Sequence, residues 1–155
     1  MSNAGSVRVV PVAERHKQDW RRLYDGYAAF YKVPMTDEIA GAVWGWLHDP
    51  AHVMNCLIAE DEDGKAIGLA HIRAMPRPLS GAECGFLDDL FVDPDARGKG
   101  VFEALFAAMD EMAQKNGWAM VRWLTQEFNY RGRSAYDRIA TKTPFILYQR
   151  DTPAG

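Results

Sequence analysis

A strand, a glycine-bearing turn and the start of a helix follow one another over residues 87–102, and this order constrains the fold more than any other feature of the chain. The strand is apolar but carries two adjacent carboxylates, Asp88 and Asp89, and a proline ends it. Gly98 and Gly100 then lead into a long segment with an apolar stripe. The first amides of a helix have no internal partner and lie at the positive end of its dipole. The sequence therefore predicts an anion-binding turn that suits a phosphate group.

The glycine spacing narrows the class of phosphate ligand. A nucleotide-hydrolase loop needs Ser or Thr directly after its lysine, whereas Lys99 is followed by Gly100. A dinucleotide-binding turn needs a third glycine, and Glu103 occupies that position. Neither of these two classes fits the turn.

The turn resembles the acyl-coenzyme A loop of the GNAT N-acetyltransferase superfamily, which has the pattern Arg/Gln-x-x-Gly-x-Gly/Ala. Phe102 departs from it, and this side chain either narrows the turn or packs within the helix. A second family pattern, an asparagine followed by a tyrosine seven residues later, is matched by Asn129 and Tyr136, with Gly132 in place of the common alanine. In this chain the loop reads Arg97-Gly98-Lys99-Gly100-Val101-Phe102.

Apolar periodicity predicts one mixed α/β domain over residues 7–151, whereas residues 1–6 look like an expression-tag remnant or disordered tail. Three of the strands form an antiparallel meander, and the GNAT-type fold adds two crossover helices packed on the sheet. A helical crossover makes the strand after residues 101–116 parallel to the strand before it. The expected strands are 7–13, 53–60, 66–75, 83–92, 118–125 and 144–150, and the expected helices are 14–31, 36–48, 101–116 and 130–139.

Composition excludes several classes of protein. A net charge of −3 without a basic run argues against nucleic acid, and no apolar run is long enough to cross a bilayer. No signal peptide opens the chain, which predicts a cytoplasmic protein. We interpret Cys56 and Cys84 as buried reduced thiols rather than a disulfide or a nucleophile. The four histidines lack metal-ligand spacing, so we expect surface or core residues and no metal.

The resemblance implies an acetyltransferase that moves an acetyl group from acetyl-coenzyme A, its co-substrate, directly to a primary amine. Tyr136 matches the family's general acid, which protonates the departing thiolate; its other interpretation is a packing tyrosine. The backbone amide that stabilises the oxyanion comes from the bulged strand before the turn. The residues assigned to the acetyl-coenzyme A site are Leu90, Phe91, Val92, Arg97, Gly98, Lys99, Gly100, Val101, Phe102 and Asn129.

An amine with a pKa of about 10 must lose a proton before it attacks, so a general base is required. Asp88 matches a glutamate that polyamine-type members place nine residues before the loop arginine, and Asp89 is its neighbour. Strand alternation places these two side chains on opposite faces unless a bulge re-aims one. Glu83 on the same strand is a third candidate.

The acceptor predicted from these residues is cationic. Carboxylates and aromatic rings together suit an ammonium group through charge pairing and cation–π contact. We therefore predict a small polyamine-like amine, an amino acid, or a protein lysine or N-terminus, in a chain that could form a homodimer. A non-catalytic acyl-coenzyme A-binding module and a structural domain are the alternatives. The expected substrate-binding residues are Tyr27, Tyr31 and Asp89, with Tyr24 and Trp46 nearby.

Overall fold

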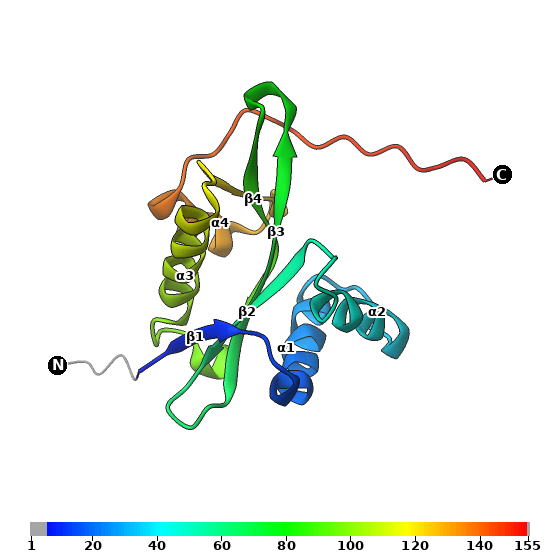
Figure 1. Ribbon diagram of the computed structural model, residues 1–155. Helices are drawn as coiled ribbons and strands as arrows, with labels where there is room; N and C mark the ends of the chain where they lie inside the picture. Colours follow the sequence, from blue (N-terminus) through cyan, green and yellow to red (C-terminus); the bar gives the residue numbers. More distant parts are fainter. Residues whose placement is uncertain (1–5, 155) are drawn as a thin grey trace. The chain divides into compact units, whose positions relative to one another are not determined.

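Five strands form one mixed sheet in the order β1-β2-β3-β4-β5 in the computed structural model, which describes residues 6–154 (Figure 1). The first four strands are antiparallel neighbours, and β5 is parallel to β4, as the crossover predicts. Nearly all of the predicted tag lies outside the described residues. The strands are β1 Arg8–Pro11, β2 Met54–Glu60, β3 Ala66–Arg77, β4 Ala82–Val92 and β5 Val121–Trp123, and the helices are α1 Lys17–Phe30, α2 Asp37–Leu47, α3 Val101–Asn116 and α4 Tyr130–Ile139.

The chain divides into two compact parts, one ending at Leu124 and the other beginning at Thr125. The first part contains the sheet and α1 to α3, and the second contains α4 and the segment that follows it. None of the helices in the described chain is long and apolar enough to cross a membrane. Nor do residues 6–154 contain a group of three or more His, Cys, Asp or Glu side chains that could hold a metal ion.

The prediction of a strand over residues 144–150 is wrong, because this segment has no regular secondary structure. Its apolar side chains, residues 145–148, are 72–85% exposed. The prediction used only the β propensity of the side chains. A strand also needs a neighbouring strand that forms hydrogen bonds with its backbone N–H and C=O groups. Within the described residues the sheet ends at β5.

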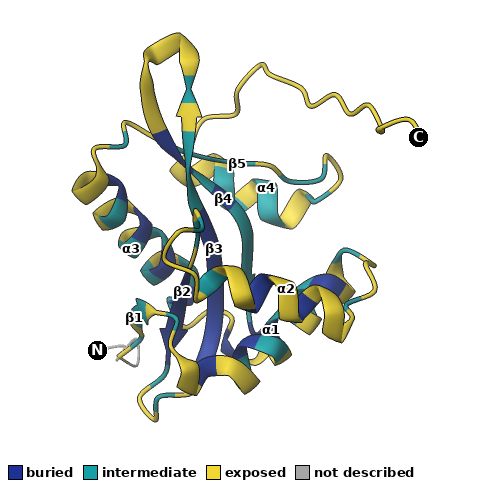
Figure 2. Ribbon diagram, turned by 45° about the vertical axis from the view of Figure 1, so that its right-hand side comes forward, coloured by how far each residue is buried: buried dark blue, intermediate teal, exposed yellow. Residues whose placement is uncertain are grey.

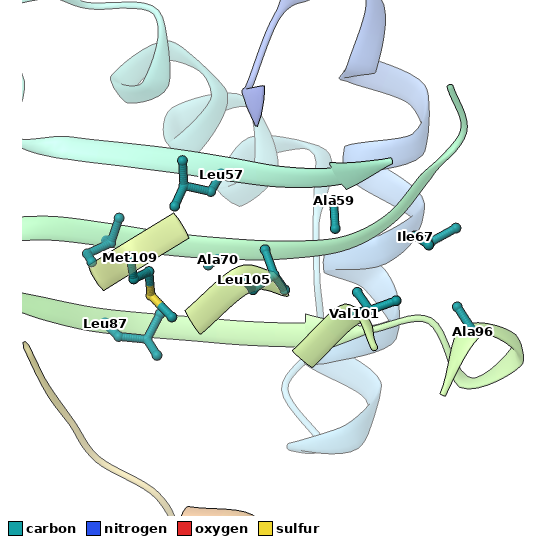
Figure 3. Packing of buried hydrophobic residues seen from close by; sticks show 10 residues of the cluster. Leu57, Ala59, Ile67, Ala70, Leu87, Ala96, Val101, Leu105 and Met109 are labelled. Atoms are coloured by element: carbon teal, nitrogen blue, oxygen red, sulfur yellow. The ribbon is translucent and has the colours of Figure 1, made fainter. Parts of the chain in front are cut away.

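The packing of α3 buries one face of the sheet (Figure 3). Every fourth residue of the helix, Val101, Leu105 and Met109, lies in this core and is almost fully buried. Close approach is required at Gly68, where a Cβ would lie 2.8 Å from a Val101 methyl group. The strand residues of the same cluster are Leu57, Ala59, Ile67, Ala70, Ile72 and Leu87.

The opposite face of the sheet is covered by α1 and α2, whose inner sides are buried (Figure 2). Trp20 and Leu23 of α1 are buried in this second core. Leu69 of β3 belongs to this cluster whereas its neighbour Ala70 belongs to the other, as strand alternation requires. Thr36 is the N-cap of α2, and its hydroxyl accepts from the amide of Ile39 at 3.1 Å. Cys56 and Cys84 are buried free thiols, as predicted.

A buried carboxylate at the end of β2 ties the first strand to the sheet. Glu60 is 1% exposed and accepts hydrogen bonds from Arg8, Arg15 and His16. Burial alone would raise the pKa of this carboxyl, but the hydrogen bonds from His16 and the two arginines lower it to about 2. Glu60 therefore stabilises the fold in its ionised form.

We predict that Glu60→Gln lowers the free energy of unfolding at pH 7 by roughly 1–3 kcal/mol, because charged hydrogen bonds are lost. A depressed pKa adds stability above the ordinary carboxyl pKa of about 4.3, and this stability is lost as the pH falls through about 2. The difference between parent and variant should therefore shrink between these two values. Urea unfolding across this range measures it, with Glu62→Gln at an exposed turn as the control. A difference that stays constant down to the acid end would contradict the prediction.

Candidate active site

A β-bulge in β4 sets the direction of the two neighbouring acids. His71 of β3 lies opposite Asp89, but Ile72 lies opposite Leu87, so Asp88 is an extra residue without a partner in the register. The bulge interrupts strand alternation at this point. Asp88 and Asp89 both bond side chains of alternate β3 residues, His71 and Arg73, and thus share one face of the sheet. The sequence predicts opposite faces unless a bulge re-aims one side chain, and this bulge is present.

Asp88 forms an ion pair. Arg73 donates from Nε to one carboxylate oxygen at 2.8 Å and from a terminal nitrogen to the other at 3.4 Å. The guanidinium carbon also lies 4.8 Å from the centre of the Phe86 ring. The backbone carbonyl of Asp88 accepts from the Tyr27 hydroxyl at 3.5 Å. The charge of Asp88 is therefore compensated within the protein.

Asp89 lies beside a histidine and two tyrosines instead. Nδ1 of His71 lies 2.7 Å from its carboxylate, which is 19% exposed. Burial raises the pKa of Tyr24 and of Tyr27, and the charge of Asp89 and hydrogen bonding to it raise both further. Both phenols therefore stay protonated at neutral pH and can donate to this carboxylate. No arginine or lysine pairs with Asp89 in the ion pairs of the described chain.

His71 is the residue of this site that the sequence analysis missed. It is 1% exposed, and its Nε2 accepts from the indole nitrogen of Trp20 at 3.0 Å. Its ring meets the Tyr24 ring edge-on, with centres 4.9 Å apart. A search for metal-ligand spacing could not find it. The sequence carries no signal for it, because only the bulged register brings His71 opposite Asp89.

Two of the four predicted aromatic residues, Tyr24 and Tyr27, lie beside the acids. Tyr24 and Tyr27 of α1 are followed by Tyr31 at its C-cap, and successive ring centres are 6.1 Å and 4.8 Å apart. Trp46 behaves differently: its ring stacks on His52 at 4.9 Å and is nearly half exposed. The structure thus brings Tyr24 and Tyr27 to Asp88 and Asp89, whereas Tyr31 packs on Tyr27 and Trp46 has a stacking partner beyond α2.

The turn after β4 is held in place from α1. Arg22 donates to the Asp93 carboxylate at 2.7 Å and to the Ala66 carbonyl at 2.8 Å. Burial would raise the pKa of Asp93, but Arg22 and the amide of Asp95 lower it. Asp93 thus fixes the point where the strand ends and the turn begins.

The conformation of the turn depends on two glycines. Gly98 and Gly100 have φ values of 78° and 82°, in the left-handed region. Gly100 is the N-cap of α3 and offers no side-chain bond, so the first amides of the helix are left without a cap. The Phe102 ring packs against that of Phe106, with ring centres 4.8 Å apart, which is the helix-packing alternative for this side chain. The exposed Arg97 and Lys99 add positive charge beside these amides.

One edge of β4 has no neighbouring strand along most of the site. The parallel pairing with β5 covers only Gly85 to Leu87. From Asp88 to Val92 no strand of the described sheet pairs with this edge, and Leu90, Phe91 and Val92 lie in this stretch. An unpaired strand edge presents amides and carbonyls that an extended ligand can bond.

The second part of the chain contains the other two predicted site residues. Asn129 caps α4, and its side-chain oxygen accepts from the Gly132 amide at 3.2 Å. A Cβ at position 132 would lie 2.4 Å from the Asn129 amide nitrogen, so glycine leaves room for this cap. Tyr136 lies in α4, where its carbonyl accepts from Ala140 at the helix end. These two residues thus share one helix, and the acids and the turn share β4 and its continuation.

A carboxylate beside tyrosines, an open strand edge and an anion-binding turn all follow one another along β4. This combination fits a protein that binds a phosphate-bearing acyl donor next to an amine, as an acyltransferase does. The profile of the family described as Acetyltransferase (GNAT) matches residues 16–140. The chain belongs to this family of acyltransferase enzymes.

Known proteins of the same fold support this assignment over nearly the whole chain. The D-amino-acid N-acetyltransferase HPA3 of Saccharomyces cerevisiae is 30% identical over 94% of this chain and 91% of its own. The ribosomal-protein-alanine N-acetyltransferase of Brucella melitensis has a TM-score of 0.80 at 24% identity, over 95% of this chain and 100% of its own. The aminoglycoside N-acetyltransferase AAC(6')-Iy, solved with CoA, has a TM-score of 0.81 at 20% identity, over 97% and 98% of the two chains. The predicted GNAT-type α/β fold is therefore confirmed.

We predict opposite effects on stability for one substitution at two glycines. No atom lies within 4 Å of a Cβ added at Gly98 or at Gly41, so packing does not decide the outcome. Gly98→Ala should destabilise the protein by about 1 kcal/mol because of its positive φ. Gly41→Ala in α2 should stabilise it by about 0.5–1 kcal/mol, since alanine favours the helix. Urea unfolding of both variants measures this difference, and a neutral or stabilising Gly98→Ala would contradict the turn conformation.

Proposed function

We propose that this enzyme transfers the acetyl group of acetyl-coenzyme A directly to a primary amine, with Asp89 as general base and Tyr136 as general acid. The observation that carries the proposal is the surroundings of Asp89, a carboxylate held by neutral donors on the strand that leads into the anion-binding turn. A donor bound along the strand edge and the turn would place its thioester beside this carboxylate. The alternative, a non-catalytic acyl-coenzyme A-binding module, has no need for such a carboxylate.

The donor site proposed here uses backbone groups more than side chains. The uncapped amides at the start of α3, with Arg97 and Lys99, would bind the phosphates of coenzyme A. The unpaired edge of β4 from Leu90 to Val92 would bond the amides of its extended arm. An amide of this edge would also stabilise the negative charge that develops on the thioester oxygen. We include Asn129 in the donor site because it matches the family's asparagine–tyrosine pattern.

Asp89 suits the base better than Asp88, because the two carboxylates have different partners. An arginine neighbour favours the ionised form of a carboxylate and makes it a weaker base, and Arg73 bonds both oxygens of Asp88. Asp89 has only the uncharged His71 and tyrosine donors described above. We propose that Asp89 binds the acceptor ammonium, takes its proton directly or through a water, and releases the neutral amine for attack. Glu83 lies at the exposed start of β4, away from this pair.

The proposed acceptor is a small amine, and an amino acid is favoured within that class. The yeast relative is named for acetylating D-amino acids, and AAC(6')-Iy for aminoglycosides, so both act on amines. Tyr27 and Tyr31 would contact the ammonium through their rings. Arg73 beside Asp88 supplies a cation close to the acids, which a zwitterionic acceptor could use for its carboxylate. Protein amines as acceptors, a homodimer and a cytoplasmic location stay predictions from the sequence.

The decisive experiment is an acceptor screen with acetyl-coenzyme A, read by thiol release. D- and L-amino acids, spermidine, a lysine peptide and a hydroxyl compound are compared at equal concentration. We predict turnover with amines and a loss in Asp89→Asn of roughly 10²- to 10⁴-fold in kcat, the range of a positioned general base. Asp88→Asn, the matched variant one residue away, should lose less, because Arg73 already compensates Asp88.

Two results would contradict this proposal. Equal kcat in Asp89→Asn and the parent would remove Asp89 as the base. Turnover of the hydroxyl compound with every amine inert would remove the amine class. Thermal shifts with coenzyme A control for folding in each variant, and a shift without any acetyl transfer would instead support the non-catalytic module.

We predict that Tyr136→Phe lowers kcat by roughly 10²-fold or more with little change in coenzyme A affinity, because only the departing thiolate uses its proton. Tyr130→Phe is the matched control, since Tyr130 begins the same helix and is exposed. Steady-state rates and coenzyme A titration of both variants separate the two effects. If Tyr136→Phe has the parent's kcat, Tyr136 has a packing role.

A further inference from the structure

The hydrogen bonds of His71 determine which of its ring nitrogens carries the proton. The Trp20 indole nitrogen can only donate, so Nε2 of His71, 3.0 Å away, must accept. The remaining nitrogen, Nδ1, lies 2.7 Å from an Asp89 carboxylate oxygen, which can only accept when ionised. A neutral ring with its proton on Nδ1 satisfies both bonds. A doubly protonated ring would set two donors against each other at Nε2.

We propose that Trp20 and His71 are positioning residues for Asp89: Trp20 keeps His71 uncharged with its proton on Nδ1, and this N–H fixes the carboxylate toward the acceptor. This inference rests on the proposed function for the role of Asp89. His71 makes no contact with solvent from which it could exchange protons freely, since it is 1% exposed and Trp20 is 2% exposed. The pair acts through Asp89.

The surroundings of His71 contain few groups that could alter its protonation. Asp89 and Asp88 face it from β4, and Arg73 on its own strand pairs with Asp88. From α1 come Tyr24 and Tyr27, and from β2 comes Cys56, which lies directly opposite His71 in the register. Burial raises the pKa of all three of these groups, so they are uncharged at neutral pH. Asp89 is thus the one charged group that His71 itself bonds in the described structure.

An uncharged histidine has a direct consequence for catalysis. An imidazolium beside Asp89 would form an ion pair and weaken the carboxylate as a base. A neutral N–H orients the carboxylate without neutralising it. The Trp20 bond therefore keeps Asp89 available for an ammonium at pH values where a free imidazole, which titrates near about 6.5, would become charged.

The first test needs no activity. Long-range proton–nitrogen NMR of the histidine rings, with His71 assigned by its loss in His71→Asn, reports the tautomer directly. In the parent we expect a proton on Nδ1 and no titration between about pH 5.5 and 8.5. In Trp20→Phe, Nε2 is free to bind a proton, and His71 should titrate. A parent ring that titrates in this range, or carries its proton on Nε2, would overturn the proposal even if the enzyme acetylates amines as proposed.

The second test uses the pH profile of kcat/KM. Trp20→Phe should move the acid limb upward by roughly one pH unit, because an imidazolium that forms at His71 pairs with Asp89 and removes its activity as a base. Trp44→Phe is the matched control: Trp44 packs against Trp20 with centres 5.0 Å apart, and its ring is in contact with His48. It should leave the limb in place. A limb that moves equally in both variants, or in neither, would contradict the role of Trp20.

Substitution of His71 itself separates positioning from packing. The asparagine amide places an N–H close to the position of histidine Nδ1, so His71→Asn keeps a donor for Asp89. His71→Ala removes it and should lower kcat by roughly 10- to 100-fold, as a misplaced catalytic group does. We expect His71→Asn to recover most of this loss while both variants bind coenzyme A. Equal kcat in the two variants would assign His71 to packing alone.

Discussion

The one-residue bulge in β4 is the constraint on which the rest of the site depends. With regular strand alternation in place of the bulge, Asp88 and Asp89 would project from opposite faces of the sheet, and one of them would enter the α3 core among Leu87 and Val101. A carboxylate in that core would have no partner and would cost several kcal/mol. The bulge instead directs both acids toward α1, while Leu87 still faces α3. The bulge at Asp88 also directly follows Leu87, the last residue of β4 that pairs with β5.

Helix α1 connects the acid pair to the turn. Its inner residues reach β3 and β4 at two separate places: Trp20 bonds His71, and Arg22 bonds the Asp93 carboxylate at the end of β4. The two contacts lie at the two ends of the segment from Asp89 to Asp93, which follows the bulge at Asp88. A helix bonded to both ends of the segment fixes the distance between Asp89 and the beginning of the turn. Positioning of this kind is what acyl transfer requires, because donor and acceptor must meet in one geometry.

Much of the fold was predictable because local signals and tertiary packing agree. The predicted bounds of α3 and α4 coincide with the observed helices: Gly100 and Gly117 bound α3 in left-handed conformations, and Asn129 caps α4. The strand over residues 144–150 was not predictable, since its apolar pattern says nothing about a partner for its backbone. The meander was predictable from its turns, and β5 is shorter than its apolar run indicates.

The site was predictable in its residue types but not in its pairings. Asp88 and Asp89 were recognised because burying a carboxylate in an apolar strand is costly without a partner. The tyrosines were recognised because aromatic rings beside carboxylates suit an ammonium group. Their roles depend on a register shift of one residue, which no hydrophobic pattern encodes. Counted outward from the turn between β3 and β4, an unbulged hairpin would put His71 opposite Asp88; with the bulge it lies opposite Asp89. The importance of His71 follows from this shift and was therefore invisible.

The acids of this protein show how a chain distinguishes structural carboxylates from a reactive one. Glu60, Asp88 and Asp93 each form an ion pair with at least one arginine. These ion pairs hold the strands and the turn together. Asp89 is nearly as enclosed, yet its partners are His71 and tyrosine hydroxyls, which orient a carboxylate without adding positive charge. Arginine on Asp89 would give a stronger pair in the free protein, but a weaker base for an incoming ammonium. Neutral donors keep the carboxylate ordered without adding positive charge. The positive charge that pairs with Asp89 therefore comes from the acceptor cation.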